Sequence, residues 1–323
     1  MKTKLPATFP KAKKKELDQI VGIIQSNARV EMVILYGSYA RGDFVEKEEY
    51  NDKTKSVFKS DFDLFIVTRS KDWQDKVRGW TLKANDEFKR NGIKTVVQFA
   101  VDNIQFTNKM LKLGQYFHKD IYKEGVLLFD SGEYKLNQPR EYLELDPQER
   151  LEQAEKSFKL FLKKNATNNL KTFEFHFKEK MFEDAAFNLH QSAEKLLHCT
   201  ELVFAGYKPP SHNLLELKGR NQKFIPNLKN FFFDEGRGCT CGKKVTPCLY
   251  KSQQGLEKIC VNCNDKARIF LLLATAYVDA RYSDDYAVSV EELQAMKADV
   301  LKLRGLVEKS CGEEIEKLKK GCE

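Results

Sequence analysis

Hydrophobic positions in the first half of the chain follow two spacings, one typical of helices and one typical of buried strands. Leu17, Ile20, Val21 and Ile24 fall on one face of a helix predicted over 13–27. A polar helix is predicted over 71–91, ended by Gly92. Three compact apolar runs predict buried strands: VEMVILYG (30–37), FDLFIV (62–67) and TVVQFAV (95–101). The region 113–132, with a last apolar strand and a turn, closes the unit.

From about residue 146 the pattern changes to long stretches with helical spacing. The almost wholly apolar stretch 267–281 is expected at the centre of a helical bundle, and Ser211 is expected to cap a shorter helix. The helices are expected over 149–165, 182–206, 209–217, 267–281 and 290–310. The polar segment 137–148 separates the two patterns, so we expect an α+β protein with a first domain over 1–140 and an all-α domain over 146–323.

Length and charge narrow the class of protein only modestly. A chain of 323 residues favours about two domains, and 41% hydrophobic residues support packed cores. The net charge of +8 permits binding to nucleotides or nucleic acid, although scattered lysines are typical of any solvated surface. No apolar run approaches a membrane span, and the lysine-rich N-terminus has no apolar core of a secretion signal, so we expect a cytoplasmic protein.

Two short motifs in the first domain carry candidate chemistry. GSYARG (37–42) follows the first apolar strand, and SDFD (60–63) begins the second. Glycine allows close approach to the backbone, and N–H groups at the start of the helix expected after Gly37 and Ser38 can receive phosphate oxygens. Asp61 and Asp63 lie two positions apart on a strand, so their carboxylates point the same way and suit Mg²⁺. Together the motifs predict a phosphate site beside a divalent-cation site.

This combination resembles the nucleotidyltransferase superfamily related to DNA polymerase β, in its minimal form. The resemblance implies a Mg²⁺-dependent enzyme that binds an NTP such as ATP, with Asp61 and Asp63 as catalytic metal ligands. It implies nucleotide binding by Gly37 and Ser38, with Arg41 as a further phosphate contact. We expect the long spacer 43–59 to form an extended hairpin or flap.

The third carboxylate that members of this family usually carry on a neighbouring strand is missing. Gln98 holds the central position of the strand expected at 95–101, and its neutral amide cannot serve as a base. Asp102, Asp120 and Glu124 are the nearby acidic residues, but none matches the motif. The motif residues for nucleotide binding are therefore present, whereas the third carboxylate used in catalysis is not.

The second half resembles the HEPN domain, a helical bundle often fused to a minimal nucleotidyltransferase. The resemblance rests on 187–217 and 276–293 and covers roughly 146–218 and 267–310. Many HEPN domains carry an Arg, then four to six residues, then a His, and these can act as ribonucleases. Here four residues separate Arg281 from Tyr286, which stands where the histidine is expected. Tyrosine is a poor base at neutral pH, so we expect a structural contact, or nucleotide, partner or RNA binding.

Three further expectations concern the helical half. HEPN relatives often dimerise through helices, so a homodimer is expected. Where the two domains are separate proteins they can act as antitoxin and toxin, which makes Tyr286 a candidate acceptor hydroxyl in the fused chain. His190 and His198 lie eight residues apart on one helix face and are expected to be core or interface histidines rather than catalytic groups.

A cysteine-rich insert over 236–266 interrupts the HEPN resemblance. Closely spaced cysteines present thiolates to one ion, and four of them would complete a tetrahedral structural Zn²⁺ site. Redox-active thiols, or no special role, are the alternatives. The candidate ligands are Cys239, Cys241, Cys248, Cys260 and Cys263, of which four would be needed.

The sequence thus predicts Mg²⁺-dependent transfer of a nucleoside monophosphate from an NTP to an unidentified acceptor, which is a protein, a small molecule or a nucleic acid. Two other functions fit the same residues. A non-catalytic nucleotide-sensing module is favoured by Gln98 and by Tyr286 in place of histidine. An enzyme that modifies small molecules, similar to the aminoglycoside nucleotidyltransferases, would require an acidic cleft.

Overall fold

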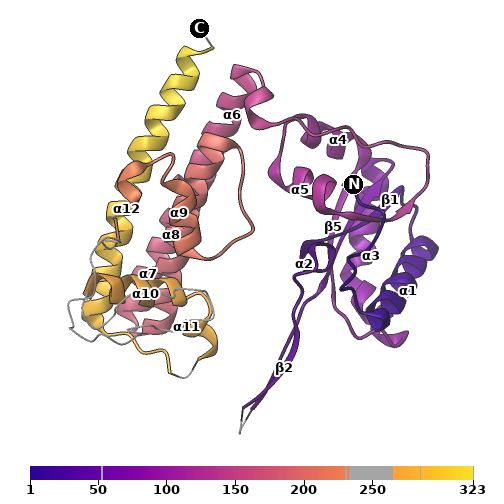
Figure 1. Ribbon diagram of the computed structural model, residues 1–323, viewed down its shortest axis with the longest axis horizontal. Helices are drawn as coiled ribbons and strands as arrows, with labels where there is room; N and C mark the ends of the chain where they lie inside the picture. The colour runs from indigo at the N-terminus through magenta and orange to yellow at the C-terminus, as the bar shows by residue number, and fades with distance from the viewer. Residues whose placement is uncertain (52–53, 230, 233–264, 284, 323) are drawn as a thin grey trace. The chain divides into compact units, whose positions relative to one another are not determined.

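A computed structural model describes residues 1–51, 54–229, 231–232, 265–283 and 285–322. The chain forms two compact units, Met1–Leu145 and Asp146–Glu323. The first combines a four-stranded sheet with helices, and the described part of the second is helical (Figure 1). The expected α+β class is therefore confirmed.

The sheet of the first unit is mixed, with the strand order β5-β4-β1-β6. Strands β4 and β5 are parallel and are connected through helix α3, whereas β1 pairs antiparallel with both β4 and β6. The bounds are β1 Met32–Tyr36, β4 Phe62–Thr68, α3 Lys71–Arg90, β5 Val97–Asn103 and β6 Val126–Asp130. A central position for β1 and β4 explains why both read as continuous apolar runs, since helices cover both faces of the sheet.

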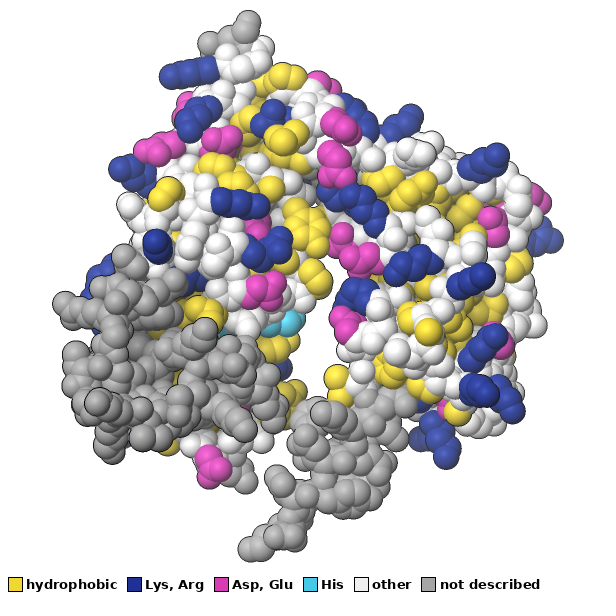
Figure 2. Space-filling view, viewed as in Figure 1, with side chains coloured by type: hydrophobic (Ala, Val, Ile, Leu, Met, Phe, Trp, Pro, Cys, Tyr) yellow, Lys and Arg dark blue, Asp and Glu magenta, His cyan; other side chains and the backbone are white. Residues whose placement is uncertain are grey.

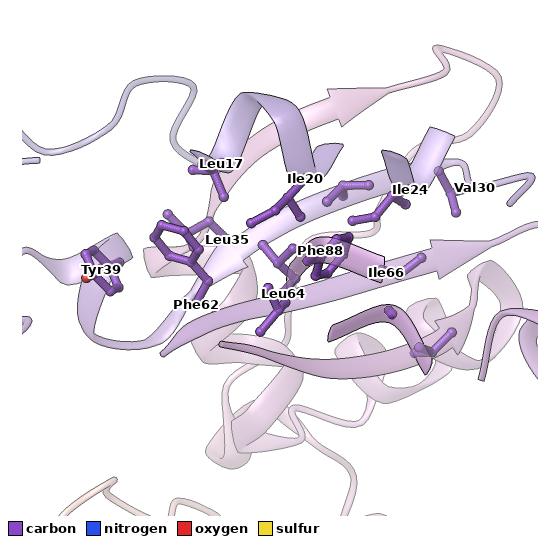
Figure 3. Close-up of a cluster of buried hydrophobic side chains, with 14 of the residues drawn as sticks. Leu17, Ile20, Ile24, Val30, Leu35, Tyr39, Phe62, Leu64, Ile66 and Phe88 are labelled. Atoms are coloured by element: carbon purple, nitrogen blue, oxygen red, sulfur yellow. The ribbon is translucent and has the colours of Figure 1, made fainter. Parts of the chain in front are cut away.

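Each face of the sheet has its own core. Leu35 and Leu64 point toward helices α1 (Lys11–Asn27) and α3, where they pack with residues such as Ile20 and Phe88 (Figure 3). The next residues along the strands, such as Phe65, point to the opposite face, covered by α4 (Ile104–Lys112) and α5 (Tyr116–Glu124). This alternation decides which helix each polar strand residue faces.

The connection between β1 and β4 contains a single helical turn and a long hairpin. Helix α2 (Gly37–Arg41) follows β1 directly and ends at Gly42, which has φ +90°. Strands β2 (Glu46–Asn51) and β3 (Thr54–Lys59) then pair antiparallel and extend away from the sheet of this unit (Figure 1). The spacer forms the extended hairpin that its length predicted.

Helix α8 (Phe182–Ala205) is the centre of the second unit. It contacts a nearly continuous helix that runs from α6 (Pro147–Ser157) through a π-helical stretch, η2 (Phe158–Ala166), into α7 (Thr167–Lys178). It also contacts the other α-helices of the unit: α9 (Leu214–Asn221), α10 (Asp265–Thr275), α11 (Asp279–Tyr282) and α12 (Val290–Lys320). Two short 3₁₀ turns complete the described elements, η1 (Tyr142–Glu144) in the first unit and η3 (Pro226–Leu228) in the second.

Three expectations about these helices are wrong in detail. The apolar stretch 267–281 is interrupted, since α10 ends at Thr275 and α11 begins at Asp279, and α8 rather than this stretch is central. Ser211 does not cap α9: Asn213 does, and its side chain accepts hydrogen bonds from two backbone N–H groups of the first turn. The last helix continues ten residues beyond 310, to Lys320.

Candidate nucleotide-binding and catalytic site

The structure brings the Gly-Ser turn against the second aspartate of the Asp-x-Asp pair. Gly37 has φ +70°, and a Cβ placed there would lie 2.1 Å from Oδ2 of Asp63. Any other residue would be strained at this φ and would displace the carboxylate. Gly37 therefore keeps the turn and the carboxylate in direct contact.

The environment of Asp63 raises its pKa and that of its neighbour Tyr36. Tyr36, the last residue of β1, pairs with Asp63 on β4. Burial and the neighbouring carboxylate of Asp61 raise the pKa of Asp63 to about 6, against the opposing effect of Arg41. Burial and Asp63 raise the pKa of Tyr36 to about 12, so its hydroxyl stays protonated near neutral pH. Two carboxylates that repel each other form a site of the kind that a divalent cation stabilises.

Gln98 occupies the position next to this pair on β5. It pairs with Asp63 in the parallel register, and its amide Nε2 donates a hydrogen bond to Oδ2 of Asp61 at 3.3 Å. The amide thus contributes a donor where a third carboxylate would contribute negative charge. This leaves Asp61, directly before β4, and Asp63, on β4, as the acidic pair of the site.

Arg41 links the turn to helix α5. Its guanidinium makes ion pairs with Asp43 at 3.0 Å and with Glu124 at 3.8 Å, and it opposes the upward pKa shifts of both Asp63 and Asp120. Helix α2, which carries Arg41, is only one turn long, so its dipole adds little to phosphate binding. Backbone N–H groups and the Arg41 side chain are the groups available to phosphate oxygens there.

Asp102 lies on β5 but takes part in a separate network. Its carboxylate accepts hydrogen bonds from Gln74 and Arg78, and it lies 3.0 Å from Nε2 of His118. His118 is buried on α5, so this network ties that helix to the end of the sheet. Asp102 therefore has a structural role, because it links β5 to α3 and α5.

A mixed sheet whose Gly-Ser turn meets an Asp-x-Asp pair defines a nucleotidyltransferase-type domain. Residues 18–134 match the family model of polymerase beta nucleotidyltransferases, and residues 160–310 match that of the HEPN domain. The chain therefore belongs to the proteins that join a polymerase beta-type nucleotidyltransferase domain to a HEPN domain. A search of curated proteins finds no match to it.

In the HEPN domain, Arg281 and Tyr286 are both held in structural contacts. The Arg281 guanidinium lies 4.6 Å from the centre of the Tyr277 ring and 4.8 Å from that of Phe187, and its Nε donates to the carbonyl of Tyr277. The hydroxyl of Tyr286 donates to the carbonyl of Leu272 at 2.9 Å, and its side chain is buried. These contacts fit the structural interpretation of the altered motif.

A buried carboxylate surrounded by histidines is the feature that sequence reasoning missed. Oε2 of Glu194 lies 2.7 Å from Nδ1 of His212, and the carboxylate also pairs with Lys195. His190 and His198 lie one helical turn on either side, fully buried, with ring nitrogens 3.8 and 3.7 Å from the same carboxylate. Burial is the main cause that lowers their pKa values, to about 4 and about 3, so both rings are neutral.

The sequence offered only part of a signal for this cluster. The positions 190, 194 and 198 repeat every four residues and so share one face of a helix. Nothing local in the sequence shows that the segment after Gly206 folds back and brings His212 to Glu194. His212 is half-exposed and stacks on the Tyr277 ring, with 4.3 Å between ring centres.

Among the described residues, no group of three or more His, Cys, Asp or Glu side chains is arranged to hold a metal ion. The candidate zinc ligands Cys239, Cys241, Cys248, Cys260 and Cys263 lie outside the described residues. Of the other cysteines, Cys199 and Cys311 are buried and free, and Cys322 is free and exposed.

The described surface shows mixed charge. On the face drawn in Figure 2, lysine and arginine side chains alternate with aspartate and glutamate over the described residues of both units. This fits the interpretation of the excess lysines as ordinary solvated surface. Among the described helices, none has the length and apolar character needed to cross a membrane.

Proposed function

We propose that this protein transfers a nucleoside monophosphate from an NTP to the hydroxyl group of an acceptor, in a Mg²⁺-dependent reaction. The observation that carries the proposal is the contact between Gly37 and Asp63, which joins a phosphate-binding turn to an acidic pair. Neither motif alone is specific, since Gly-Ser turns and Asp-x-Asp pairs both occur widely. The match of residues 18–134 to the polymerase beta nucleotidyltransferases adds independent support.

The chain's own residues divide the work of binding. Backbone N–H groups at Gly37 and Ser38 and the guanidinium of Arg41 would bind triphosphate oxygens. Asp61 and Asp63 fit Mg²⁺, because they are two oxygen-donor side chains whose mutual repulsion contributes to the raised pKa of Asp63. Bound Mg²⁺ would take its other ligands from phosphates and water, and would supply charge stabilisation at the reacting phosphate.

We propose three classes of acceptor: a protein, a nucleic acid and a small molecule. The HEPN match at 160–310 supports a toxin–antitoxin-like role, in which the acceptor is a protein or a nucleic acid. A small molecule of the aminoglycoside kind is the third class. Self-modification at Tyr286 is disfavoured, because its hydroxyl is buried and already donates to a backbone carbonyl.

The test uses the full chain, each NTP in turn and Mg²⁺, with pyrophosphate release and intact mass as readouts. The acceptors are the chain itself, an RNA oligonucleotide and an aminoglycoside, and the control is Asp61→Ala. Pyrophosphate release or a nucleotide adduct that disappears in Asp61→Ala supports the proposal. Release that is equal in both proteins, or absent with every acceptor, contradicts it.

A nucleotide-sensing module is the second candidate, favoured by the Gln98 amide that donates to Asp61. A site of this kind would bind NTP with Mg²⁺ and release no pyrophosphate. Calorimetry with a non-hydrolysable NTP analogue, run beside the turnover assay, separates the two functions. Binding without turnover on any acceptor supports sensing.

Other properties remain predictions that accompany this function. We propose a homodimer formed through the HEPN domain, which light scattering on the full chain would test. RNA binding would show as affinity that falls steeply with added salt. A zinc ion in the cysteine-rich insert would be found by elemental analysis, and a cytoplasmic location by cell fractionation.

A further inference from the structure

The alternation of strand residues places the whole acidic site on one face of the sheet. Asp63 and Phe65 lie two residues apart on β4 and therefore point to the same side, and Asp61, directly before the strand, continues this alternation. Phe65 belongs to the core formed with α4 and α5, so the two aspartates face the side covered by these helices. Tyr36, opposite Asp63, packs against the same core.

Helix α5 lies against this face beside the aspartates. The ring of Phe117 packs edge-on against Tyr36 and Phe65, with centre-to-centre distances of 5.6 and 6.0 Å. Ile121, one turn later, is buried in the same core. The first half of α5 is thus fixed against the two residues that flank Asp63 on the strands.

The second half of α5 reaches the Gly37–Arg41 turn. Glu124 makes its ion pair with Arg41 from the last residue of the helix. Asp120 lies three residues after Phe117 and four before Glu124, so it shares their face of the helix. Asp120 therefore stands between Phe117, which packs against Tyr36, and Glu124, which pairs with Arg41, and the Arg41 guanidinium is near enough to act on its pKa.

Unlike Asp43, Glu124 and Asp102, Asp120 has no hydrogen-bonded or ion-paired partner among the described residues. Asp43 and Glu124 are paired with Arg41, and Asp102 is held by Gln74 and Arg78. Within the described part of the chain, Asp120 makes no hydrogen bond or ion pair. Burial and Glu124 raise the pKa of Asp120 to about 6, against the opposing effects of Lys119, Lys123 and Arg41.

We propose that Asp120 is the third acidic group of the transferase site and acts as the general base for the acceptor hydroxyl. This inference rests on the proposed nucleotidyltransferase function. As the acceptor oxygen forms its bond to the α-phosphorus, its proton passes to the Asp120 carboxylate. The bond from the α-phosphorus to the bridging oxygen breaks, and pyrophosphate leaves with that oxygen. The acidic group is thus supplied by α5, from the side of the sheet opposite to α1 and α3, instead of by β5, where Gln98 stands.

The central test compares Asp120→Asn with the wild type, using ATP and Mg²⁺ and the acceptor class on which the wild type acts. We expect pyrophosphate release to fall about a hundredfold or more, since a general base contributes rate enhancements of this order. We expect the Kd for ATP to stay within about twofold, because the proton acceptor contributes to the transition state and little to ground-state binding. Asp120→Glu, which keeps a carboxylate, should retain more activity than Asp120→Asn.

The pH–rate profile separates a base from a structural residue. We expect the wild type to lose activity below about pH 6, with the groups facing Asp120 being Glu124, Lys119, Lys123, Arg41 and Tyr116. At saturating Mg²⁺, which keeps Asp63 ionised, this acidic limb should disappear in Asp120→Asn. In Glu124→Gln the limb should persist but lie at lower pH, because the charge that raises the pKa of Asp120 is gone.

Three results would overturn the inference. The first is that Asp120→Asn releases pyrophosphate at the wild-type rate. The second is that its affinity for ATP falls by the same factor as its rate. Both leave the proposed function intact. A wild-type protein without turnover on any acceptor removes the proposed function, and this inference with it.

Discussion

Gly37 and Asp63 lie so close that a single added carbon on the glycine would collide with the carboxylate, 2.1 Å from its Oδ2. Gly37→Ala must therefore move Asp63 and also place alanine at φ +70°. We expect the free energy of unfolding to fall by about 1–3 kcal/mol. Pyrophosphate release should fall about a hundredfold, because a reacting site tolerates little displacement.

The matched control for this change is Gly79→Ala in α3. A Cβ on Gly79 meets no atom within 4 Å, and alanine favours a helix. We expect this variant to be as stable as the wild type or more so, with unchanged turnover. Equal behaviour of the two variants in urea unfolding and activity would contradict the role assigned to Gly37.

Asp63→Asn should make the metal-free protein more stable at alkaline pH. The folded-state pKa of about 6 lies above the usual 3.8, so ionisation of Asp63 costs stability as the pH rises through 6. A shift of this size corresponds to about 3 kcal/mol, which solvent screening at a half-exposed group reduces to about 1 kcal/mol. Urea unfolding in EDTA measures the free energy of unfolding of both proteins. The increase in Asp63→Asn should appear at pH 8 and vanish at pH 4. Asp86→Asn, an exposed position on α3, should show neither effect.

Gln98→Glu should convert the site into a stronger cation site. The new carboxylate replaces the amide that donates to Asp61 and adds negative charge beside Asp63. We expect lower stability than the wild type in EDTA and a larger rise in Tm on adding Mg²⁺, since a ligand stabilises the folded state according to its affinity. An unchanged response to Mg²⁺, equal to that of the exposed control Gln25→Glu, would speak against a metal at Asp61 and Asp63.

Glu194→Gln should destabilise the HEPN domain near neutral pH. Burial favours the protonated form of this carboxyl, but His212 and Lys195 outweigh burial and lower its pKa to about 2. The stabilisation is therefore complete above the usual value of 4.5 and is lost as the pH falls toward 2. Removal of a buried charge from its partners costs about 3 kcal/mol, which urea unfolding at pH 7 would detect. Glu313→Gln, exposed on α12, is the control, and equal stability of the two variants would refute the account.

Tyr286→Phe separates a structural tyrosine from an acceptor. The change removes the hydrogen bond to the Leu272 carbonyl and should lower the free energy of unfolding by about 1 kcal/mol. Transfer to the acceptor should be unchanged. If intact-mass spectra instead show a nucleotide adduct in the wild type that is lost in this variant, Tyr286 is the acceptor and the structural interpretation is wrong.

The sheet and the main helices were predictable because their signals are local. The β1 and β4 strands have apolar runs that reflect burial on both faces, and α3 and α8 have long helical spacing. Helices α4 and α5 were missed, since each is short and lies beside strand-like residues. The N-cap of α4, Asn103, was a usable signal: its side chain accepts from the N–H of Phe106.

The site was predictable only as far as adjacent motifs reach. Gly37, Asp61 and Asp63 could be placed together because each follows or begins a strand of known direction. Asp120 could not be placed, because its position depends on which face of the sheet α5 covers, and that follows from tertiary packing. The pairing of His212 with Glu194 was hidden for the same reason, since an irregular segment carries it.

The π-helical stretch Phe158–Ala166 allows the helix that packs along α8 to lose a residue without losing its contacts to α8. Its wider turn holds more residues than an α-helical turn, and α-helix continues on both sides of it. Loss of one residue within the stretch would tighten the winding there and leave the side chains before and after it facing α8. The same deletion within α7 or α8 would rotate every later side chain by about 100°. A one-residue deletion in the helix that runs from α6 to α7 is therefore accommodated within the π-helical stretch. The side chains of α6 and α7 that contact α8 keep their orientation.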